Sequence, residues 1–316
     1  MKQQSAKEQK FIRTCSIWRA LEVIGDTPTL LILEAIWFGE RRFDGICRRS
    51  GQLKALTSNR LKSLETNGLL TTRLYSERPP RKEYILTTKG RDLYWVSLML
   101  LRWEQAWSAK KTKLEVRLVH TTCGKRFKPV PKCGNCGNEF SARDVAWEEG
   151  PGVGMMAAVY KRRRRHRHQT HNPESLSLFT DAAEVMGDRW ASLIIRSVFT
   201  GLRRFDEILN DTGMASNILT ERLQWLVEKG VLTAVLYQTN PARHEYWLTR
   251  KGIDYYPVLV MLQRWGDEYY ASPEGPPLIL EHKTCGHALN AFVGCSECGE
   301  PVHPTDATVE LVERRR

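Results

Sequence analysis

Two stretches decide the fold of this chain: residues 41–69 read RRFDGICRRSGQLKALTSNRLKSLETNGL, and residues 203–231 read RRFDEILNDTGMASNILTERLQWLVEKGV. Their offset of 162 residues recurs along the chain without an insertion or deletion, for example in Gly25-Asp26 and Gly187-Asp188. A gapless register of this length indicates a duplicated unit, and its period is far longer than the roughly 20–50 residues of solenoid repeats. Each copy is therefore expected to bury its own core.

One amphipathic helix inside the first stretch is the strongest local signal. Its apolar face comprises Leu53, Leu56, Leu61 and Leu64. Polar side chains occupy the opposite face, and Gly68 provides a stop. The pattern predicts a helix from Leu53 to Asn67.

The surrounding pattern supplies the other elements of copy one. It predicts helices at 16–25, 28–38 and 42–49, a hairpin with strands at 69–75 and 82–87, and an apolar helix at 91–107. Asp26 or Thr27 can cap the second helix, and Pro28 suits its first turn. In copy two we expect helices at 178–187, 190–200, 216–229 and 252–270, with a hairpin across 231–249. This order is that of a winged helix-turn-helix.

The helix at 91–107 is more apolar than a small domain needs. Its excess apolar surface predicts packing against a partner, either the other copy or another chain.

Each copy ends in the pattern His-x2-Cys-x9-Cys-x2-Cys. The residues are His120, Cys123, Cys133 and Cys136, and then His282, Cys285, Cys295 and Cys298. Four nitrogen and sulfur ligands suit tetrahedral zinc, so we expect two structural Zn²⁺ ions per chain, one within each copy. Reduced or redox-active thiols without metal are the alternative, and His287 and His303 could compete as the fourth ligand in copy two.

The composition is that of a globular protein. The chain has 316 residues, 41% of them hydrophobic and 27% charged, which fits two globular domains. The start, Met1 to Lys10, is polar, and no apolar stretch is long enough to span a bilayer, so we expect a cytoplasmic protein. The net charge of +12 favours a polyanionic partner. The basic octapeptide at 161–168 either contacts DNA or is a solvated linker.

Many spaced positions in both copies agree with a known pattern. In copy one they are Cys15, Ala20-Leu21, Ile24-Gly25-Asp26, Leu31-Ile32-Leu33, Gly39, Arg42-Phe43, Arg60-Leu61, Leu64, Gly68-Leu69, Tyr84, Leu86-Thr87 and Gly90. In copy two they are Gly187-Asp188-Arg189-Trp190, Leu193-Ile194-Ile195-Arg196, Arg204-Phe205, Leu219-Thr220-Glu221-Arg222-Leu223, Gly230, Tyr246, Leu248-Thr249 and Gly252. These residues resemble the HxlR family of bacterial winged-helix transcription regulators. Copy one departs at Pro28 and Thr57, and copy two at Ser177, so copy one is expected to bind DNA differently.

The resemblance implies a sequence-specific DNA-binding regulator, and most such proteins repress. Family members form homodimers through their terminal helices, so the tandem chain is expected to be an intrachain pseudo-dimer on a double-stranded DNA operator at the bacterial nucleoid. A further homodimer of the whole chain stays open. The fold class expected is mainly α with small β: two winged helix-turn-helix domains in tandem, each with a C-terminal zinc-ribbon-like β module. The expected boundaries are 11–110 and 174–272 for the winged helices, 111–146 and 273–310 for the zinc modules, and 147–173 for a basic linker.

Recognition helices and hairpin tips should contact the DNA. The candidates in copy one are Lys54, Ser58, Asn59, Arg60, Lys62, Arg78, Arg81 and Lys82. Those in copy two are Ser216, Asn217, Thr220, Arg222, Gln224, Arg243 and His244, with Glu221 beside them. Because the two sets differ, the two half-sites should differ. The alternative is that these residues form only a solvated helix face and hairpin tip.

Cys15 matches a position that some HxlR regulators use to sense oxidants, so a thiol switch is one interpretation and a small buried side chain is the other. Cys47 is expected in the core. An RNA- or ribosome-associated zinc protein is the alternative function. No enzyme motif is present, so catalysis is not expected.

Overall fold

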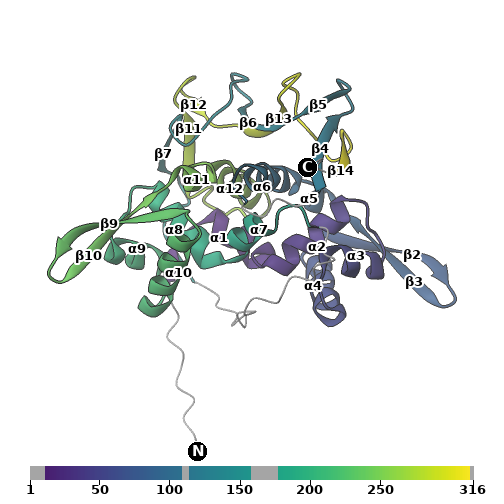
Figure 1. Ribbon diagram of the computed structural model, residues 1–316, viewed down its shortest axis with the longest axis horizontal. Helices are drawn as coiled ribbons and strands as arrows, with labels where there is room; N and C mark the ends of the chain where they lie inside the picture. The colour runs from purple at the N-terminus through teal and green to yellow at the C-terminus, as the bar shows by residue number, and fades with distance from the viewer. Residues whose placement is uncertain (1–10, 109–113, 158–176, 314–316) are drawn as a thin grey trace, which may run out of the picture.

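The computed structural model describes residues 11–108, 114–157 and 177–313, and the basic octapeptide lies outside these ranges. The molecule is elongated and nearly two-fold symmetric, with one copy at each end (Figure 1). The two hairpins project from opposite ends, and the strands that follow each copy lie together on one side (Figure 1). None of the described helices has the length and apolar content that a membrane crossing requires.

Both copies fold as the predicted winged helix. Copy one contains α1 (Ser16–Ile24), α2 (Thr27–Trp37), α3 (Phe43–Ser50), α4 (Lys54–Thr66), β2 (Leu70–Glu77), β3 (Pro80–Leu86), α5 (Thr88–Arg91) and α6 (Tyr94–Trp107). Copy two contains α7 (Thr180–Gly187), α8 (Arg189–Phe199), α9 (Phe205–Thr212), α10 (Ser216–Glu228), β9 (Leu232–Thr239), β10 (Ala242–Leu248), α11 (Arg250–Ile253) and α12 (Tyr256–Tyr269). Each copy has four helices, then the hairpin, then a one-turn helix and a long helix, and α9 was not among the helices expected for copy two.

Local chemistry explains most boundaries. Asp26 caps α2 by accepting a hydrogen bond from the Thr29 N–H at 2.9 Å, and Asp188 caps α8 in the same way. The closing helix divides into α5 and α6, a break that the apolar pattern does not reveal. The prediction that Leu53 belongs to the buried face of this helix is wrong. Leu53 is the extended residue before α4, and it is 66% exposed.

The two copies share one core. Helices α6 and α12 pack against each other at the centre of the molecule (Figure 1). The Trp103 indole N–H donates to the Lys251 carbonyl, and the equivalent Trp265 donates to the Lys89 carbonyl. Such reciprocal contacts define a two-fold interface, here within one chain. The excess apolar surface of the closing helix therefore packs against the other copy.

The strands after each winged helix pair between copies. Copy one supplies β4 (Leu114–His120), β5 (Lys125–Phe127), β6 (Pro129–Cys133), β7 (Val145–Glu149) and β8 (Met155–Ala157). Copy two supplies β11 (Leu278–His282), β12 (His287–Ala288), β13 (Ala291–Cys295) and β14 (Ala307–Glu313). The antiparallel pairs β4 with β14, β6 with β13 and β7 with β11 each join the two copies. Each zinc-ribbon-like region therefore contains strands of both.

The start of the expected linker is ordered. Strand β7 extends into it, and β8 pairs with β1 (Phe11–Arg13) near the start of the described chain.

Candidate nucleic-acid interface and metal centres

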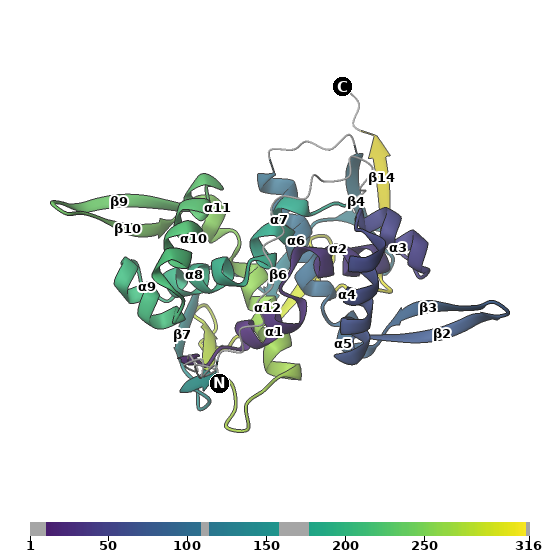
Figure 2. The same cartoon turned by 90° about the horizontal axis from the view of Figure 1, so that it is seen from below.

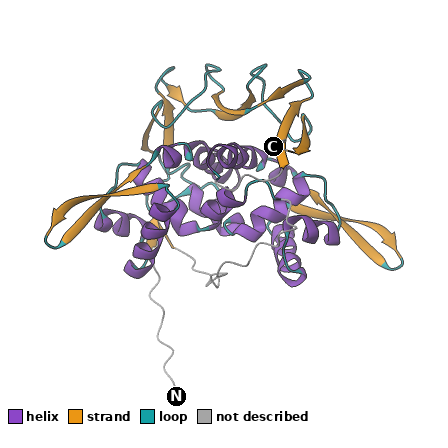
Figure 3. Cartoon of the chain, in the orientation of Figure 1, coloured by secondary structure: helices purple, strands orange, loops and turns teal. Residues whose placement is uncertain are grey.

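The recognition helices α4 and α10 lie on the same side of the molecule, away from the β strands that follow each copy (Figure 1). Seen from below, the two helices flank the central helices and each hairpin extends outward (Figure 2). Figure 3 shows the same division between the helical layer and the β layer. One face of a single chain thus presents two recognition helices and two wings.

The predicted base-reading side chains of α4 are exposed. Lys54, Ser58, Asn59 and Lys62 all face solvent, because Leu61 and Leu64 turn the opposite side of the helix into the core. In α10 the exposed set is Ser216, Asn217, Thr220, Glu221 and Gln224. Helical phase therefore places both candidate sets where a DNA groove could be reached.

Arg60 and Arg222 need correction as DNA-binding candidates. Arg60 pairs with Asp26 at 3.0 Å, and Arg222 pairs with Asp188 at 2.5 Å. The side chain of Arg222 is only 10% exposed. These arginines neutralise the aspartates that cap α2 and α8, so their guanidinium groups stabilise the fold.

The wings carry the remaining predicted contacts. Arg78, Arg81, Lys82 and Arg243 are exposed, and His244 is half-buried. Sequence reasoning missed four further exposed cations on copy one, which are Arg41, Arg42, Arg48 and Arg73. The repeat could have indicated two of them, because the pair Arg41-Arg42 recurs as Arg203-Arg204 immediately before the third helix of copy two.

At six positions around the recognition helix and wing, copy one is the more basic copy. In copy two Asn210 replaces Arg48, Ser216 replaces Lys54, Glu221 replaces Asn59, Gln224 replaces Lys62, Val235 replaces Arg73 and Asn240 replaces Arg78. Each of these six changes removes a positive charge or adds a negative one. Phosphate attraction is therefore expected to be stronger at copy one.

The eight predicted metal ligands come together, but in a different grouping. One cluster contains His120, Cys123, Cys295 and Cys298, and the other contains Cys133, Cys136, His282 and Cys285. Grouping the ligands within each copy was wrong. The reason is the antiparallel pairing of β6 with β13, in which Cys133 lies opposite Ala291 and Cys295 opposite Pro129, at the two ends of the ladder. Each Cys-x2-Cys turn is thereby carried to the His-x2-Cys turn of the other copy.

The ligand spacing is close to that around a tetrahedral ion. In the first cluster His120 Nδ1 lies 3.6 Å from Cys123 Sγ and 3.3 Å from Cys298 Sγ, and the Cys123 and Cys295 sulfurs are 4.0 Å apart. Ligands about 2.0–2.3 Å from zinc in a tetrahedron are separated by about 3.3–3.8 Å. In the second cluster His282 Nδ1 lies 3.3 Å from Cys136 Sγ and 3.5 Å from Cys285 Sγ. Both clusters could therefore hold Zn²⁺.

Tight turns hold the paired ligands. In each turn the N–H of the glycine after the second ligand donates to the carbonyl of the first ligand. These glycines, Gly124, Gly137, Gly286 and Gly299, all have φ between +67° and +83°. Side chains disfavour that conformation, so glycine is required there. A backbone hydrogen bond at Lys125 lowers the pKa of the Cys123 thiol, which favours the thiolate that a metal needs.

The histidines of the clusters are well defined. His120 and His282 are fully buried and face the thiols with Nδ1, whereas Nε2 of each has no partner among the described residues. His287 and His303 are exposed and belong to neither cluster, so they do not replace His282.

Cys15 lies at the junction of the two copies. It is 4% exposed, accepts a hydrogen bond from the Trp18 N–H at 3.4 Å, and contacts the buried guanidinium of Arg196. By the repeat, the same contact in the other half joins Ser177 to Glu34, with the hydroxyl donating to the carboxylate at 2.7 Å. Cys47 is in the core, as expected.

Comparison with known proteins identifies the helical parts. Residues 23–112 and 185–274, together more than half of the chain, match the family model of the HxlR-like helix-turn-helix. An uncharacterized HTH-type transcriptional regulator of Mycobacterium tuberculosis is 43% identical over 129 residues, covering 41% of this chain and 82% of the relative.

Two further proteins are similar to parts of this chain. The HTH-type transcriptional regulator YodB of Bacillus subtilis is 33% identical over 89 residues, covering 28% of this chain and 80% of the relative. A solved structure of a proposed transcription factor from Pseudomonas aeruginosa is 36% identical, covers 39% of this chain and 84% of its own, and has a TM-score of 0.32.

Proposed function

Because this chain belongs to the HxlR-like helix-turn-helix family, with two copies of the domain in tandem, we propose that it is a DNA-binding regulator that reads two unequal half-sites. The observation that carries the proposal is the placement of α4 and α10 on one face, with different exposed side chains on each (Figure 1). Identical subunits would read a symmetrical operator, whereas this chain should prefer an asymmetrical one.

The chemistry of the two helices suggests different bases. Lys54 and Lys62 of α4 suit the guanine acceptors O6 and N7, and Asn59 suits adenine. Asn217 and Gln224 of α10 suit adenine. Copy one should therefore select a half-site that contains guanine, and copy two a half-site richer in adenine.

The wings would hold phosphates beside each half-site. Arg78, Arg81 and Lys82 give copy one several contacts, whereas copy two offers Arg243 and His244. Occupation of both half-sites excludes other proteins from the same DNA, so we expect repression of promoters that overlap the operator, in the bacterial cytoplasm.

Metal ions bound at the two clusters would stabilise the fold. With four protein ligands at each centre no coordination position stays open for a substrate, so bound Zn²⁺ would be structural. Because each centre takes two ligands from each copy, the ions would join the two readers. A single chain then supplies the complete pseudo-dimer, and we expect one chain per operator.

Sequencing of DNA fragments selected by the purified protein tests the proposal. The expected result is an asymmetrical site. Lys62→Ala should relax the copy-one half and Gln224→Ala the copy-two half, each by about 1–3 kcal/mol of discrimination. Equal loss of affinity for selected and random DNA in both variants would contradict base reading, and preferential selection of RNA would favour the RNA-associated alternative.

Cys15 supports a second, regulatory role. Oxidation of its thiol to a sulfenic acid would add an oxygen atom to a buried junction already filled by Arg196, and so would disturb the contact between copies. Mild peroxide should weaken operator binding of the wild-type protein more than that of Cys15→Ser, with metal release followed in parallel. An equal response in both proteins would assign any sensitivity to the metal-site thiols instead.

A further inference from the structure

The two copies differ at the turn before their third helix. In copy two the Glu207 carboxylate accepts hydrogen bonds from the backbone N–H groups of Arg203 and Arg204, both at 2.9 Å. The equivalent of Glu207 in copy one is Gly45. There the N–H groups of Arg41 and Arg42 have no acceptor among the described residues. Two donors that hold an anionic group in copy two are thus unfilled in copy one.

A second carboxylate has a different ion-pair partner in each copy. In copy two Glu245 pairs with Arg204 at 3.2 Å. In copy one the equivalent Glu83 pairs with Arg73 at 2.5 Å, a residue that copy two replaces with valine. Arg42, the counterpart of Arg204, therefore has no ion pair with any described residue. Its guanidinium lies over the Tyr75 ring, 4.6 Å from the centroid, and adds a positive charge without a carboxylate partner beside the two unfilled donors.

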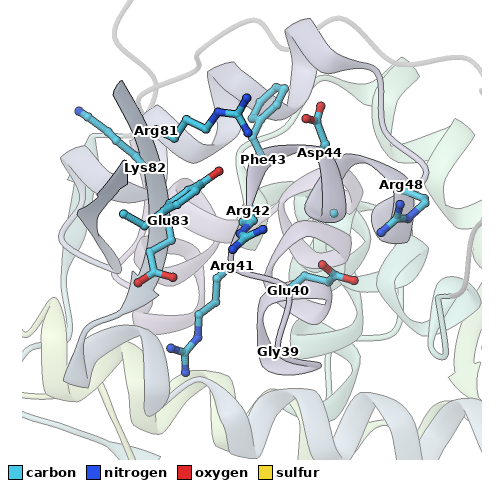
Figure 4. Close-up of a pocket in the computed structure, with 12 residues that line it drawn as sticks. Gly39, Glu40, Arg41, Arg42, Phe43, Asp44, Arg48, Arg81, Lys82 and Glu83 are labelled. Carbon is cyan, nitrogen blue, oxygen red and sulfur yellow. The ribbon is translucent and has the colours of Figure 1, made fainter. Parts of the chain in front are cut away.

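These groups line an open cleft of about 870 Å³ between the α2–α3 turn and the hairpin (Figure 4). The cations of its lining are Arg41, Arg42, Arg48, Arg81 and Lys82. Two of its three carboxylates are already engaged, since Asp44 pairs with Lys54 at 3.4 Å and Glu83 pairs with Arg73. The cleft therefore carries a clear excess of positive charge.

Glu40 is the one remaining carboxylate of the cleft. Its Oε2 atom lies 2.0 Å from the position that a Cβ of Gly45 would occupy, and it has no hydrogen bond or ion pair with a described residue. The equivalent residue in copy two is Leu202. Glu40 is thus an internal anion at the end of a flexible side chain, attracted by the Arg49 guanidinium without a direct ion pair, which an incoming anion could displace.

We propose that copy one carries a phosphate-binding site in this cleft, and that Glu207 closes the corresponding site in copy two. The donors are the backbone N–H groups of Arg41 and Arg42 with the side chains of Arg42 and Arg48. A tetrahedral oxyanion suits paired backbone donors at a helix start surrounded by arginines. Its source is either the DNA backbone, which rests on the proposed function, or free phosphate.

Substitutions at Gly45 and at its counterpart Glu207 test whether the two backbone donors bind an anion. Gly45→Gln supplies a neutral amide oxygen for the two donors, whereas Gly45→Ala leaves them open. Glu207→Gly opens the site in copy two, and Glu40→Gln removes the internal anion. Copy two already carries glutamate at this position, and an added Cβ at residue 45 meets only the flexible end of Glu40. All four variants should fold, which thermal melting checks.

The DNA arm measures affinity against salt concentration. Each phosphate contact contributes about 0.9 to the slope of log K against log salt. Gly45→Gln should reduce the slope by about this amount on selected and random DNA alike, and Gly45→Ala should not. Glu207→Gly should increase the slope by a similar amount, and Glu40→Gln should raise affinity.

The second arm measures thermal stability without DNA, in inorganic phosphate against chloride at equal ionic strength. Stabilisation by phosphate that is smaller in Gly45→Gln than in Gly45→Ala supports a free-phosphate site. If Gly45→Gln changes the salt dependence of DNA binding but not the stabilisation by phosphate, the DNA backbone supplies the bound phosphate. Identical slopes and identical phosphate responses in all variants would overturn the inference. Wild-type protein that selects no DNA would refute the proposed function, while the phosphate arm still decides this site.

Discussion

Arg222 and Gln224 stand two residues apart on α10 and have opposite environments. Arg222 is buried against Asp188, whereas Gln224 is exposed. Arg222→Ala leaves the capping aspartate unpaired and should lower the free energy of unfolding by about 2–3 kcal/mol. Gln224→Ala should change stability by less than about 0.5 kcal/mol. Urea melts of both variants check this, and an Arg222→Ala protein as stable as wild type would restore Arg222 as a DNA contact.

Thr57 is a polar residue at an apolar position. Its hydroxyl is fully buried and has no hydrogen-bond partner among the described residues, and the equivalent residue of copy two is the buried Leu219. Thr57→Val removes an unsatisfied group and should raise the free energy of unfolding by about 1 kcal/mol. The matched change Leu219→Thr should lower it. A Thr57→Val protein that melts below wild type would show that the hydroxyl has a partner.

Helical periodicity was sufficient for some residues and not for others. It placed Lys54, Ser58 and Lys62 on the exposed face because the opposite face is leucine-rich. Arg60 lies at the border of that face. Its side chain turns inward because it pairs with Asp26, which is 34 residues earlier in the chain. Such long-range pairing leaves no trace in local periodicity.

The elements themselves were largely predictable, because caps, glycine stops and turn residues act locally. The pairing of β6 with β13 was not. The repeat shows that each copy contains the same two ligand turns, but the spacing of ligands is the same whether an ion is bound within a copy or between copies. The outcome depends on strands about half the chain apart, which sequence spacing cannot specify.

Helices α2 and α7 meet at a buried carboxylate with a strong pH dependence. Glu34 accepts hydrogen bonds from the Ser177 hydroxyl and the Leu178 N–H, and burial raises its pKa to about 7. The folded protein keeps this proton after the unfolded chain has lost it near pH 4.5. The Glu34 contribution to stability is therefore complete below about pH 4.5, and falls as the pH rises to about 7.

Glu34→Gln tests this contribution. The neutral amide should remove a loss on the order of 3 kcal/mol between these pH values. Burial also raises the pKa of Glu104 to about 6, which gives a slope of the same sign. The measurement is therefore the difference between variant and wild-type unfolding free energies from pH 5 to pH 8. A difference that stays constant with pH would contradict the raised pKa of Glu34.

At the scale of the whole molecule, duplication within one chain lets the two halves diverge while their interface stays reciprocal. Trp103 and Trp265 keep equivalent hydrogen bonds across the centre. The exposed surfaces of α4 and α10 have meanwhile changed, with Lys62 and Gln224 at equivalent positions. A homodimer of identical subunits could not hold such different readers. Asymmetrical reading therefore requires that the two copies act as one unit.

Metal stoichiometry of two double variants tests that unit most directly. His120→Ala/Cys136→Ser removes one ligand from each cluster, whereas Cys123→Ser/Cys298→Ser removes two ligands from the same cluster. Zinc bound per chain is measured after dialysis against a weak chelator. Shared centres predict that the first variant loses both ions and that the second keeps one. If the first variant keeps one ion and the second keeps none, each copy binds its own metal and the two readers are not joined through it.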